Sequence, residues 1–367
     1  MKIMLFIPTV GAGGAERVIT LMANYWAEQG YSVVLLSLDD PLRTPFFSLH
    51  AKVTYQALDL IRPRKNYLAK GWRTLDQIRR VRRCIQKHRP TVLIAQLDIA
   101  IFLAVAATRG LSTKVIIYEG TNPYLSQTNP YLKKLNNVLY KLADHLVLQT
   151  HQIAKTFPNY LQKKISVIYN PIASPHSFLQ PYDYAKNLKE KKIVSVGRLV
   201  YPKAFGILIR AFHVFSQKRK GWSLLIMGEG EERQSLETLC EELGIADQVS
   251  LPGSVKDPLN TVQACSMFVL SSRYEGLPNT LCEAMSIGMP VVATRCEFGP
   301  EELINSGENG LLVPVEDVEA LASAFDTLAD DPDYCQRIGT NARQITDSLN
   351  MDNIMHEWGT VIRKLTS

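Results

Sequence analysis

The hydrophobic and polar positions of the chain follow two periods, one typical of buried strands and one typical of helices. In the first half, short runs are apolar almost throughout and rich in β-branched residues, as strands buried in a parallel sheet are. These runs are residues 3–8, 32–38, 53–58, 92–96, 114–119 and 145–148. Stretches with apolar residues at helical spacing lie between several of them, at residues 16–29, 75–87 and 131–142. This alternation predicts a doubly wound α/β domain.

The same alternation starts again in the second half. Its strand candidates are residues 193–196, 223–228, 249–251, 267–270, 290–294 and 310–313, and its helical patterns are 204–219, 231–243, 279–287 and 315–329. Between the halves, residues 170–192 combine Pro171, Pro175 and Pro181 with a charged run, which predicts a linker. Residues 351–365 form a last amphipathic helical pattern with no strand after it.

The length of 367 residues is more than twice that of a typical domain, which agrees with two domains. We predict a domain over 1–172, a linker over 173–192, a second domain over 193–350 and a closing helix over 351–367. The composition, 46% hydrophobic and 21% charged, excludes a disordered or collagen-like chain.

The cysteines and the apolar segments indicate the compartment. Six scattered cysteines contain no C-x-x-C pair, which argues against a disulfide framework or a structural zinc and for a reducing compartment. The apolar start of the chain is cut short by glycines and Glu16, and the run 92–107 is interrupted by Gln96 and Asp98. We therefore expect neither a targeting segment nor a membrane span, but a cytoplasmic protein that associates peripherally with the membrane.

Positive charge is concentrated in one segment. The formal net charge is +6, from 41 Lys and Arg against 35 Asp and Glu, and residues 61–90 hold eleven Lys or Arg with one Asp. One predicted helix carries Arg79, Arg80, Arg82 and Arg83 beside Trp72, Ile78, Val81 and Ile85. Such a basic amphipathic helix suits an anionic membrane surface or a lipid phosphate, with a solvated helix face as the alternative. No array of base-stacking aromatics accompanies the charge, so nucleic acid is not expected.

A glycine-rich loop, residues 9–16 (TVGAGGAE), joins the first strand to a helix. Glycines let backbone N–H groups approach a phosphate, whose charge the helix N-terminus favours. The loop nearly matches the dinucleotide fingerprint, with Asp39 or Asp40 as the ribose-binding acid, but Glu16 stands where the third glycine belongs. The alternative is that the glycines only close the turn.

Polar residues also follow the fifth predicted strand. Glu119, Thr121 and Asn122 come at its carboxyl end, where α/β crevices bind ligands, although an ordinary turn has the same composition. In the second half, Arg198 and Lys203 flank a strand–helix junction. Two cations there suit a diphosphate, whereas their alternative role is that of ordinary surface charges.

Residues 271–284 (SSRYEGLPNTLCEA) carry the strongest signal. Gly276 and Pro278 mark a turn, and a helix beginning near Asn279 would point the N–H groups of Asn279 and Thr280 at a phosphate. Glu275 and Glu283 would face one cleft, where carboxylates suit the hydroxyls of a sugar or ribose. In the alternative interpretation, Glu283 only complements the helix dipole and Glu275 lies in solvent.

Four motifs together resemble those of the retaining glycosyltransferases of family 4. They are Gly13-Gly14-Ala15-Glu16, Gly197-Arg198-Leu199 with Lys203, the Glu275-x7-Glu283 pair and Gly299-Pro300-Glu301. The resemblance extends nearly end to end and implies the GT-B fold, in which two Rossmann-like, doubly wound parallel-sheet domains face a cleft. Within the family, the chain looks most like bacterial enzymes that add hexose or N-acetylhexosamine to lipid-linked or surface glycans.

The resemblance implies a role for each motif. Gly13 and Gly14 would approach the donor diphosphate and its sugar, Arg198 and Lys203 would neutralise the diphosphate, and Glu275 would hold the hydroxyls of the transferred sugar. The turn would cradle the β-phosphate, Glu283 would bind the ribose, the base would lie near residues 252–255, and the closing helix would return to the first domain. The residues of the turn are Gly276, Leu277, Pro278, Asn279 and Thr280, those nearest the base are Ser254 and Val255, and those of the acceptor side are Glu16, Glu119, Thr121 and Asn122.

Two positions depart from the family pattern. Many members carry a His near the end of the fifth strand, where this chain has Glu119-Gly120-Thr121-Asn122. The residue after Lys203 is Ala204, where the family commonly has Gly. The first departure bears on the acceptor side.

The resemblance implies that an acceptor hydroxyl attacks the anomeric carbon on the face that the nucleotide leaves, so that configuration is retained without a protein nucleophile. We expect a UDP-sugar donor, a lipid-linked glycan acceptor and neither metal nor cofactor. The single Asp-x-Asp spacing, Asp331-Pro332-Asp333, reads as a loop before a helix. The alternatives are a sugar-nucleotide epimerase of the same fold, a NAD-dependent oxidoreductase and a non-catalytic glycan-binding protein.

Overall fold

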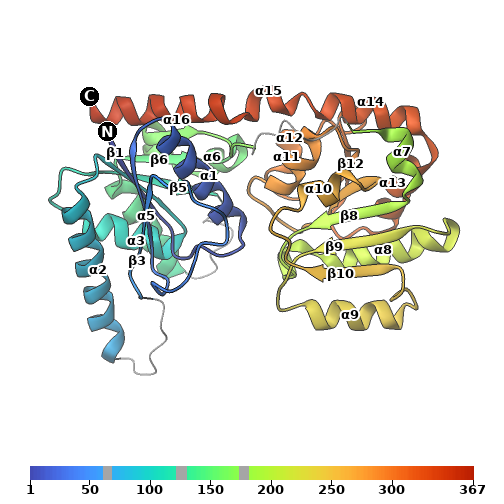
Figure 1. Ribbon diagram of the computed structural model, residues 1–367, viewed down its shortest axis with the longest axis horizontal. Coiled ribbons are helices and arrows are strands. Elements are labelled where there is room, and N and C mark those ends of the chain that lie inside the picture. Colours follow the sequence, from blue (N-terminus) through green and yellow to red (C-terminus); the bar gives the residue numbers. More distant parts are fainter. Residues whose placement is uncertain (61–67, 121–129, 173–181) are drawn as a thin grey trace. The chain divides into compact units, whose positions relative to one another are not determined.

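The computed structural model describes residues 1–60, 68–120, 130–172 and 182–367, with the backbone alone at 68–72 and 130–133. These residues divide into two compact units, one of residues 1–171 with 354–367 and one of residues 172–353 (Figure 1). The predicted Thr121 and Asn122 lie outside the described residues, as does the side chain of Trp72.

The first unit is built on a seven-stranded parallel sheet of order β3-β2-β1-β4-β5-β6-β7. Its central strands are buried because helices in the connections between strands, such as α1, α2 and α3, cover the sheet, which explains their continuous apolar runs. The strands are β1 (Lys2–Phe6), β2 (Ser32–Ser37), β3 (Val53–Ala57), β4 (Val92–Gln96), β5 (Lys114–Glu119), β6 (His145–Leu148) and β7 (Ile165–Val167). The helices are α1 (Gly14–Glu28), α2 (Leu68–His88), α3 (Asp98–Ala107), α5 (Pro130–Leu142), α6 (His151–Thr156), η1 (Asn159–Lys164) and α16 (Met351–Thr366).

Helix α16 belongs to the first unit although it ends the chain. Trp358 is fully buried, and its ring packs edge-to-face on Tyr118 of β5 at 5.1 Å and on Trp26 of α1 at 6.3 Å between centroids. Aromatic pairs at such spacing add to the stabilisation that burial provides. This contact holds the closing helix on the sheet of the first unit.

The second unit is built on a six-stranded parallel sheet of order β10-β9-β8-β11-β12-β13. Its strands are β8 (Lys192–Val196), β9 (Ser223–Met227), β10 (Val249–Gly253), β11 (Met267–Leu270), β12 (Val291–Thr294) and β13 (Leu311–Val313). The main helices are α8 (Phe205–Lys218), α9 (Arg233–Glu242), α11 (Asn279–Ser286), α13 (Val318–Asp330) and α14 (Pro332–Ala342). Shorter helices are α7 (Tyr184–Lys189), η2 (Tyr201–Lys203), α10 (Leu259–Gln263), α12 (Pro300–Leu303) and α15 (Ile345–Leu349).

The second sheet has a hydrophobic core on each face. Ile193 joins the cluster that contains Phe212 and Phe325, whereas the next residue, Val194, joins the cluster that contains Met285. Successive side chains of a strand point to opposite faces, so the two clusters flank the sheet. The unit is therefore doubly wound, as its sequence pattern predicts.

The described part of the predicted linker over 173–192 is a structured part of the second unit. Residues 184–189 form α7, and Tyr182 is 8% exposed, with its hydroxyl 2.7 Å from the carbonyl oxygen of Cys265 and 2.8 Å from that of Ser266. The prediction of a linker was wrong here because it rested on the prolines and charges of the segment and gave no weight to Tyr182 and Tyr184, which pack into or against the core. Strand β7 was not predicted, since three half-buried residues are too few to show a period.

In both sheets the strand order reverses once, between β1 and β4 in the first and between β8 and β11 in the second. The loops that leave neighbouring strands in opposite directions open a crevice at such a switch point, beyond the carboxyl ends of the strands. The predicted diphosphate and sugar residues of the second half lie in the loops after β8 and β11. Among the described helices, none is both long and apolar enough to cross a membrane.

Candidate functional site

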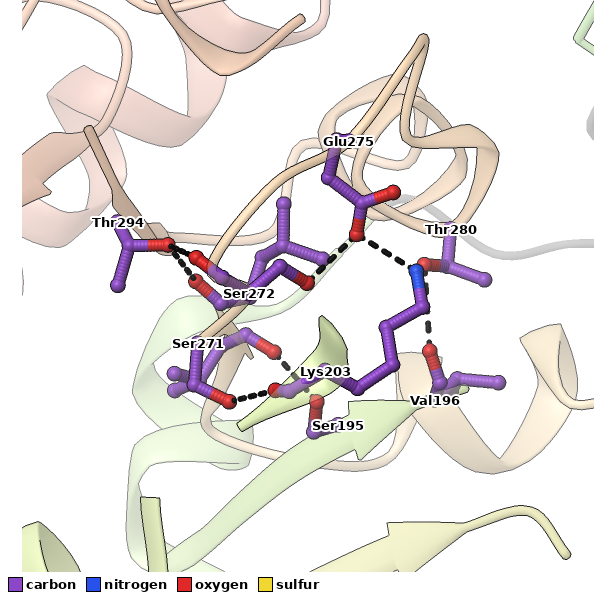
Figure 2. A network of polar contacts seen from close by, with 10 residues as sticks. Ser195, Val196, Lys203, Ser271, Ser272, Glu275, Thr280 and Thr294 are labelled. Carbon is purple, nitrogen blue, oxygen red and sulfur yellow. Dashed lines mark hydrogen bonds and ion pairs between the residues drawn. The ribbon is translucent and has the colours of Figure 1, made fainter. Parts of the chain in front are cut away.

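The loops after β8 and β11 are joined by an ion pair (Figure 2). The Nζ atom of Lys203, at the end of η2, lies 2.6 Å from Oε1 of Glu275, which precedes α11. Both side chains are mostly buried, 22% exposed for Lys203 and 10% for Glu275. The alternative in which Glu275 lies in solvent is therefore wrong, and the two residues given separate roles by sequence contact each other.

Hydroxyl groups hold this pair in place. Ser272 is fully buried, and its Oγ donates to Oε1 of Glu275 at 2.6 Å. Ser271 Oγ donates to the carbonyl oxygen of Lys203 at 2.8 Å, and Thr294 Oγ1, at the end of β12, donates to that of Ser272 at 2.5 Å. Sequence reasoning missed these three hydroxyls. The only feature of the sequence that marks them is their position, because each is a polar residue directly after, or at the end of, an apolar strand.

Arg273 fastens the loop after β8 from a second direction. Its guanidinium stacks 4.0 Å from the ring centre of Tyr201, its Nε lies 2.6 Å from Glu316 Oε1, and its backbone N–H donates to Pro202 at 2.8 Å. A planar cation on an aromatic face with a carboxylate partner is a rigid arrangement. Arg273, which was not predicted, supports the segment that presents Lys203.

Arg198 differs from Lys203 in having no partner. Its side chain is exposed and makes no hydrogen bond or ion pair within the described residues. The loop that carries it is tightly packed underneath, since a Cβ atom on Gly228 would lie 1.8 Å from the carbonyl oxygen of Gly197. The arrangement leaves one uncommitted guanidinium beside a cation that is already neutralised.

Backbone geometry explains two glycine-related features. Ala204 adopts the left-handed conformation, with φ 50° and ψ 38°, which accounts for the family's preference for glycine after the lysine. Gly299 has φ 81°, and a Cβ there would lie 2.1 Å from the carbonyl oxygen of Gly276. Glu301 pairs with Arg295 at 2.7 Å. Within the described contacts, Gly299-Pro300-Glu301 therefore packs against the turn after Glu275.

The remaining donor residues stay predictions. Glu283 lies in the second turn of α11 and is 6% exposed, and Gly276, Leu277 and Pro278 are buried just before that helix. Thr280 Oγ1 lies 3.4 Å from the carbonyl oxygen of Val196, so the start of α11 adjoins the end of β8 (Figure 2). Exposed Ser254 and Val255 follow β10 at the edge of the sheet.

The glycine-rich loop of the first unit caps α1. Gly13 is the N-cap residue, and a Cβ there would lie 2.0 Å from Oε2 of Glu16, whose carboxylate thus folds back over the helix N-terminus. That position complements the helix dipole. A phosphate approaching Gly13 and Gly14 would have to displace this carboxylate.

Asp39 is committed to the fold. It is 1% exposed, its Oδ2 accepts the N–H of Val10 at 2.7 Å, and its Oδ1 lies 3.1 Å from NH1 of Arg43. With both oxygens engaged, Asp39 ties the loop after β2 to the glycine-rich loop. It does not serve as the exposed ribose-binding acid that the oxidoreductase alternative needs, and exposed Asp40 uses Oδ1 to accept the N–H of Leu42 at 2.9 Å.

Glu119 is buried at the end of β5, 5% exposed, and its Oε2 accepts a hydrogen bond from the hydroxyl of Tyr140 at 3.2 Å. The predicted acceptor-side carboxylate is thus anchored by α5. Its predicted neighbours Thr121 and Asn122 lie outside the described residues.

The surroundings of the basic helix α2 differ from those of the predicted membrane-binding helix. Val81 and Ile85 are buried in the first unit, so these two side chains do not form an apolar surface that a membrane could contact. Arg82 is not a membrane contact, because its NH1 donates to the carbonyl oxygens of Ala107 and Arg109 at 2.8 and 2.7 Å, where it caps the end of α3. Arg79 and Arg83 are exposed, and Arg80 is partly exposed.

No metal cluster or reactive thiol emerges among the described side chains. They contain no group of three or more His, Cys, Asp or Glu placed to hold a metal ion. Asp331 caps α14 by accepting the N–H of Tyr334 at 2.8 Å, so Asp331-Pro332-Asp333 forms the cap and first residues of the helix, where a loop before the helix was predicted. All six cysteines are free and buried, and burial, with Glu275 nearby, raises the pKa of Cys296 to about 12.

One cavity lies beside the site. It has a volume of about 680 Å³ and opens between α8 and α9, with Ala204, Arg210, Glu232 and Arg273 in its wall. None of the predicted donor residues lines it. Ala204 and Arg273, which adjoin the loop of Lys203, line this cavity, whereas Lys203 and Glu275 do not.

Comparison with known proteins identifies both units. The model of the family described as Glycosyltransferase Family 4 matches residues 12–174, and that described as Glycosyl transferases group 1 matches residues 179–345. An uncharacterised glycosyltransferase of Haemophilus influenzae is 29% identical over 98% of this chain and 99% of its own. A Campylobacter jejuni α-1,4-N-acetyl-D-galactosaminyltransferase, named for an acceptor linked to diphospho-undecaprenol, is 26% identical over 100% of this chain and 99% of its own.

Solved structures agree on the fold. Sucrose-phosphate synthase of Thermosynechococcus elongatus superposes with a TM-score of 0.82 at 18% identity, covering 99% of this chain and 98% of its own. Anabaena HepE, solved with UDP and glucose, superposes with a TM-score of 0.81 at 18% identity, covering 99% of each chain. The TM-scores establish the GT-B fold of two Rossmann-like domains. Because the sequence identity is only 18%, these likenesses concern the fold alone.

Proposed function

The chain belongs to the glycosyltransferases with the GT-B fold, and we propose that it moves a hexose or N-acetylhexosamine from a nucleotide-sugar to a hydroxyl of a lipid-linked glycan. We propose a UDP-sugar donor, retention of configuration and no metal requirement. The observation that carries the donor side is the ion pair of Lys203 and Glu275 at the switch point of the second sheet. This pair places a cation suited to a diphosphate 2.6 Å from a carboxylate suited to sugar hydroxyls.

Donor binding would rearrange this pair. The diphosphate carries its own negative charge, so Lys203 gains a second anionic partner beside Glu275, and exposed Arg198 supplies a further cation. Glu275 keeps the hydroxyl of Ser272 and can accept from the hydroxyls of the sugar. The N-terminus of α11, directly after Pro278, favours the β-phosphate. The roles of Gly13, Gly14, Ser254, Val255 and Glu283 rest on the family resemblance.

The proposed reaction needs no nucleophile from the protein. The bond from the anomeric carbon to the donor phosphate oxygen breaks while a bond to the acceptor oxygen forms on the same face. The acceptor proton passes to the departing phosphate oxygen, which leaves a nucleoside diphosphate and a glycoside with the configuration of the donor. Electrostatic stabilisation of that leaving group then provides most of the rate, through Arg198 and Lys203.

The acceptor proposal rests on the relatives. Two Campylobacter jejuni transferases, 26% identical to this chain, are named for acceptors linked to diphospho-undecaprenol. A substrate with such a lipid places the reaction at a membrane surface, and we propose the cytoplasmic face.

A binding measurement followed by a product assay tests the function. Calorimetry with UDP, GDP, ADP and NAD should give micromolar binding of one nucleoside diphosphate, and Glu283→Ala should weaken it. Incubation with the matching labelled nucleotide-sugar and undecaprenyl-diphosphate-linked glycans should transfer label to lipid. Isomerised sugar-nucleotide in the absence of acceptor would instead identify an epimerase, and binding of NAD alone would overturn the proposal.

The metal requirement is tested separately. Turnover should be unchanged after dialysis against EDTA, since the diphosphate charge is met by side chains in the proposed site. Activity that disappears in EDTA and returns with Mn²⁺ would show that a metal carries this charge instead.

A further inference from the structure

Helix α5 of the first unit carries an apolar stripe on its outer side. Leu135, Val138 and Leu142 are 38%, 51% and 43% exposed, and their spacing of three and four residues places them on one face of the helix. Tyr160 of η1, 53% exposed, extends the stripe: its hydroxyl lies 3.4 Å from Asn137 Oδ1, and its ring centre lies 4.6 Å below Nζ of Lys141. We call these four apolar residues the α5 patch.

Other residues of α5 pack into the unit, since Leu139 is 5% exposed and Tyr140 is 1% exposed, whereas the members of the α5 patch are 38–53% exposed. A monomeric soluble protein rarely gathers large exposed apolar side chains in one place without a partner. The four members of the patch make up a third of the twelve large apolar side chains that are exposed in the described residues.

Cations lie on the same elements as the patch and at the end of α5. Lys134 and Lys141 of α5 and Lys163 of η1 are exposed. At the end of α5, Lys164 Nζ donates to the carbonyl oxygens of Lys141 and Ala143 at 3.0 and 2.9 Å, and Arg109 NH2 donates to that of Leu142 at 2.9 Å.

The nearby carboxylate, Asp144, is already engaged. Its Oδ1 lies 3.4 Å from Lys114 Nζ and its Oδ2 accepts the N–H of Val115 at 2.8 Å. The exposed apolar side chains therefore lie on a helix that also presents exposed lysines, and the carboxylate that follows this helix is already paired. This combination is complementary to lipid headgroups that carry negative charge, with acyl chains beneath them.

We propose that the α5 patch is a docking surface for an anionic lipid bilayer, with Leu135, Val138, Leu142 and Tyr160 at the level of the headgroups. Helix α2, the basic segment of the sequence, is less suited to this role because its apolar residues Val81 and Ile85 are buried. The proposal rests on the proposed lipid-linked acceptor for its purpose, since such an acceptor is presented at a membrane. Its lipid binding can nevertheless be measured without any acceptor.

Vesicle flotation of the full chain tests the docking surface. The probes are vesicles of phosphatidylcholine alone and of phosphatidylcholine with phosphatidylglycerol. The patch variant is Leu135→Gln/Val138→Gln/Leu142→Gln, which keeps good helix formers on a surface that is already exposed. The charge variant is Lys134→Gln/Lys141→Gln/Lys163→Gln. The matched control, on α2, is Leu75→Gln/Arg79→Gln/Arg83→Gln.

We expect the wild type to float with the anionic vesicles at low salt and to remain unbound with phosphatidylcholine alone. The patch and charge variants should each lose about tenfold or more in partition coefficient, because the first loses apolar side chains that can enter the interface and the second loses cations that an anionic surface attracts. The α2 control should lose less than about threefold. Thermal unfolding of all variants at wild-type temperature would show that the fold is intact.

Three results would overturn the proposal. They are a wild type that ignores anionic vesicles, a patch variant that floats like the wild type, and an α2 control that loses as much binding as the patch variant. A dimer in solution that the patch substitutions dissociate would assign the patch to a second copy of the chain instead. UDP binding by the patch variant should equal that of the wild type, so failure of the donor proposal would show there, independently of flotation.

Discussion

Lys203 and Glu275, 72 residues apart in sequence, form an ion pair of 2.6 Å across the loops that leave β8 and β11. A mostly buried pair of this kind is costly to break, because removal of one partner leaves the other charge without compensation. The two side chains proposed for the donor's diphosphate and sugar therefore also stabilise the second unit. Loss of activity and loss of stability must be separated when either is replaced.

A single and a double substitution separate these effects. Lys203→Met should lower the free energy of unfolding by about 2 kcal/mol, because the carboxylate of Glu275 then retains only neutral hydrogen-bond donors. Lys203→Met/Glu275→Gln should recover about half of that loss while remaining inactive. Urea unfolding and turnover measured on the same samples check both statements, and equal stability of the single and double variants would contradict the coupling.

Arg198→Ala should affect catalysis without affecting stability. The side chain is exposed and has no polar partner within the described residues, so the free energy of unfolding should change by less than about 0.5 kcal/mol. Turnover should fall about 10²–10³-fold if this cation stabilises the departing diphosphate. Steady-state kinetics on wild type and variant decide the point, and a wild-type rate would remove Arg198 from the site.

Two glycine substitutions in the second unit should have opposite effects. A Cβ on Gly228 would lie 1.8 Å from the carbonyl oxygen of Gly197, so Gly228→Ala should displace the loop of Arg198 and reduce both stability and turnover. A Cβ on Gly206, in α8, would meet only Leu239 Cδ2 at 3.8 Å, so Gly206→Ala should stabilise by up to about 1 kcal/mol. Thermal unfolding of the two variants compares them directly, and the same sign in both would show that the close approach does not govern the loop.

The stability of the first unit should decrease in acid through His145. Burial, with Lys364 and Lys164 nearby, lowers the pKa of His145 to about 4 from an ordinary value of about 6.5. The unfolded chain thus binds a proton that the folded chain resists, so this contribution is present above pH 6.5 and is lost as the pH falls toward 4. One pKa unit corresponds to about 1.4 kcal/mol, which sets the loss at up to about 3 kcal/mol.

The variant His145→Gln isolates this contribution. Glutamine can keep a hydrogen bond to Ser166 Oγ, which lies 2.9 Å from Nε2 of the histidine, but it does not titrate. Urea unfolding at pH 7.5 and pH 4.5 should show a smaller loss for the variant than for the wild type. Parallel losses in the two proteins would place the acid sensitivity at other groups.

Much of the fold follows from local pattern. The continuous apolar runs of β1, β4, β8 and β11 predicted parallel strands because a strand covered on both faces has no polar side to display. The restart of the alternation in the second half predicted two domains. Where the pattern was too short, as at β7, or masked by prolines and charges, as at α7, the sequence was misread.

The tertiary structure decided which side chains contact one another. The helical period of α2 shows that it has an apolar face, but the fold determines that this face is buried, that Arg82 caps α3, and that the exposed stripe is on α5. The composition of residues 271–284 pointed to a polar site after a strand, yet the pairing of Glu275 with Lys203 and Ser272 depends on the order of the strands in the sheet. Periodicity and turn chemistry act within a few residues and can be read from the chain, whereas the neighbours of a charge are set by contacts between segments far apart in sequence.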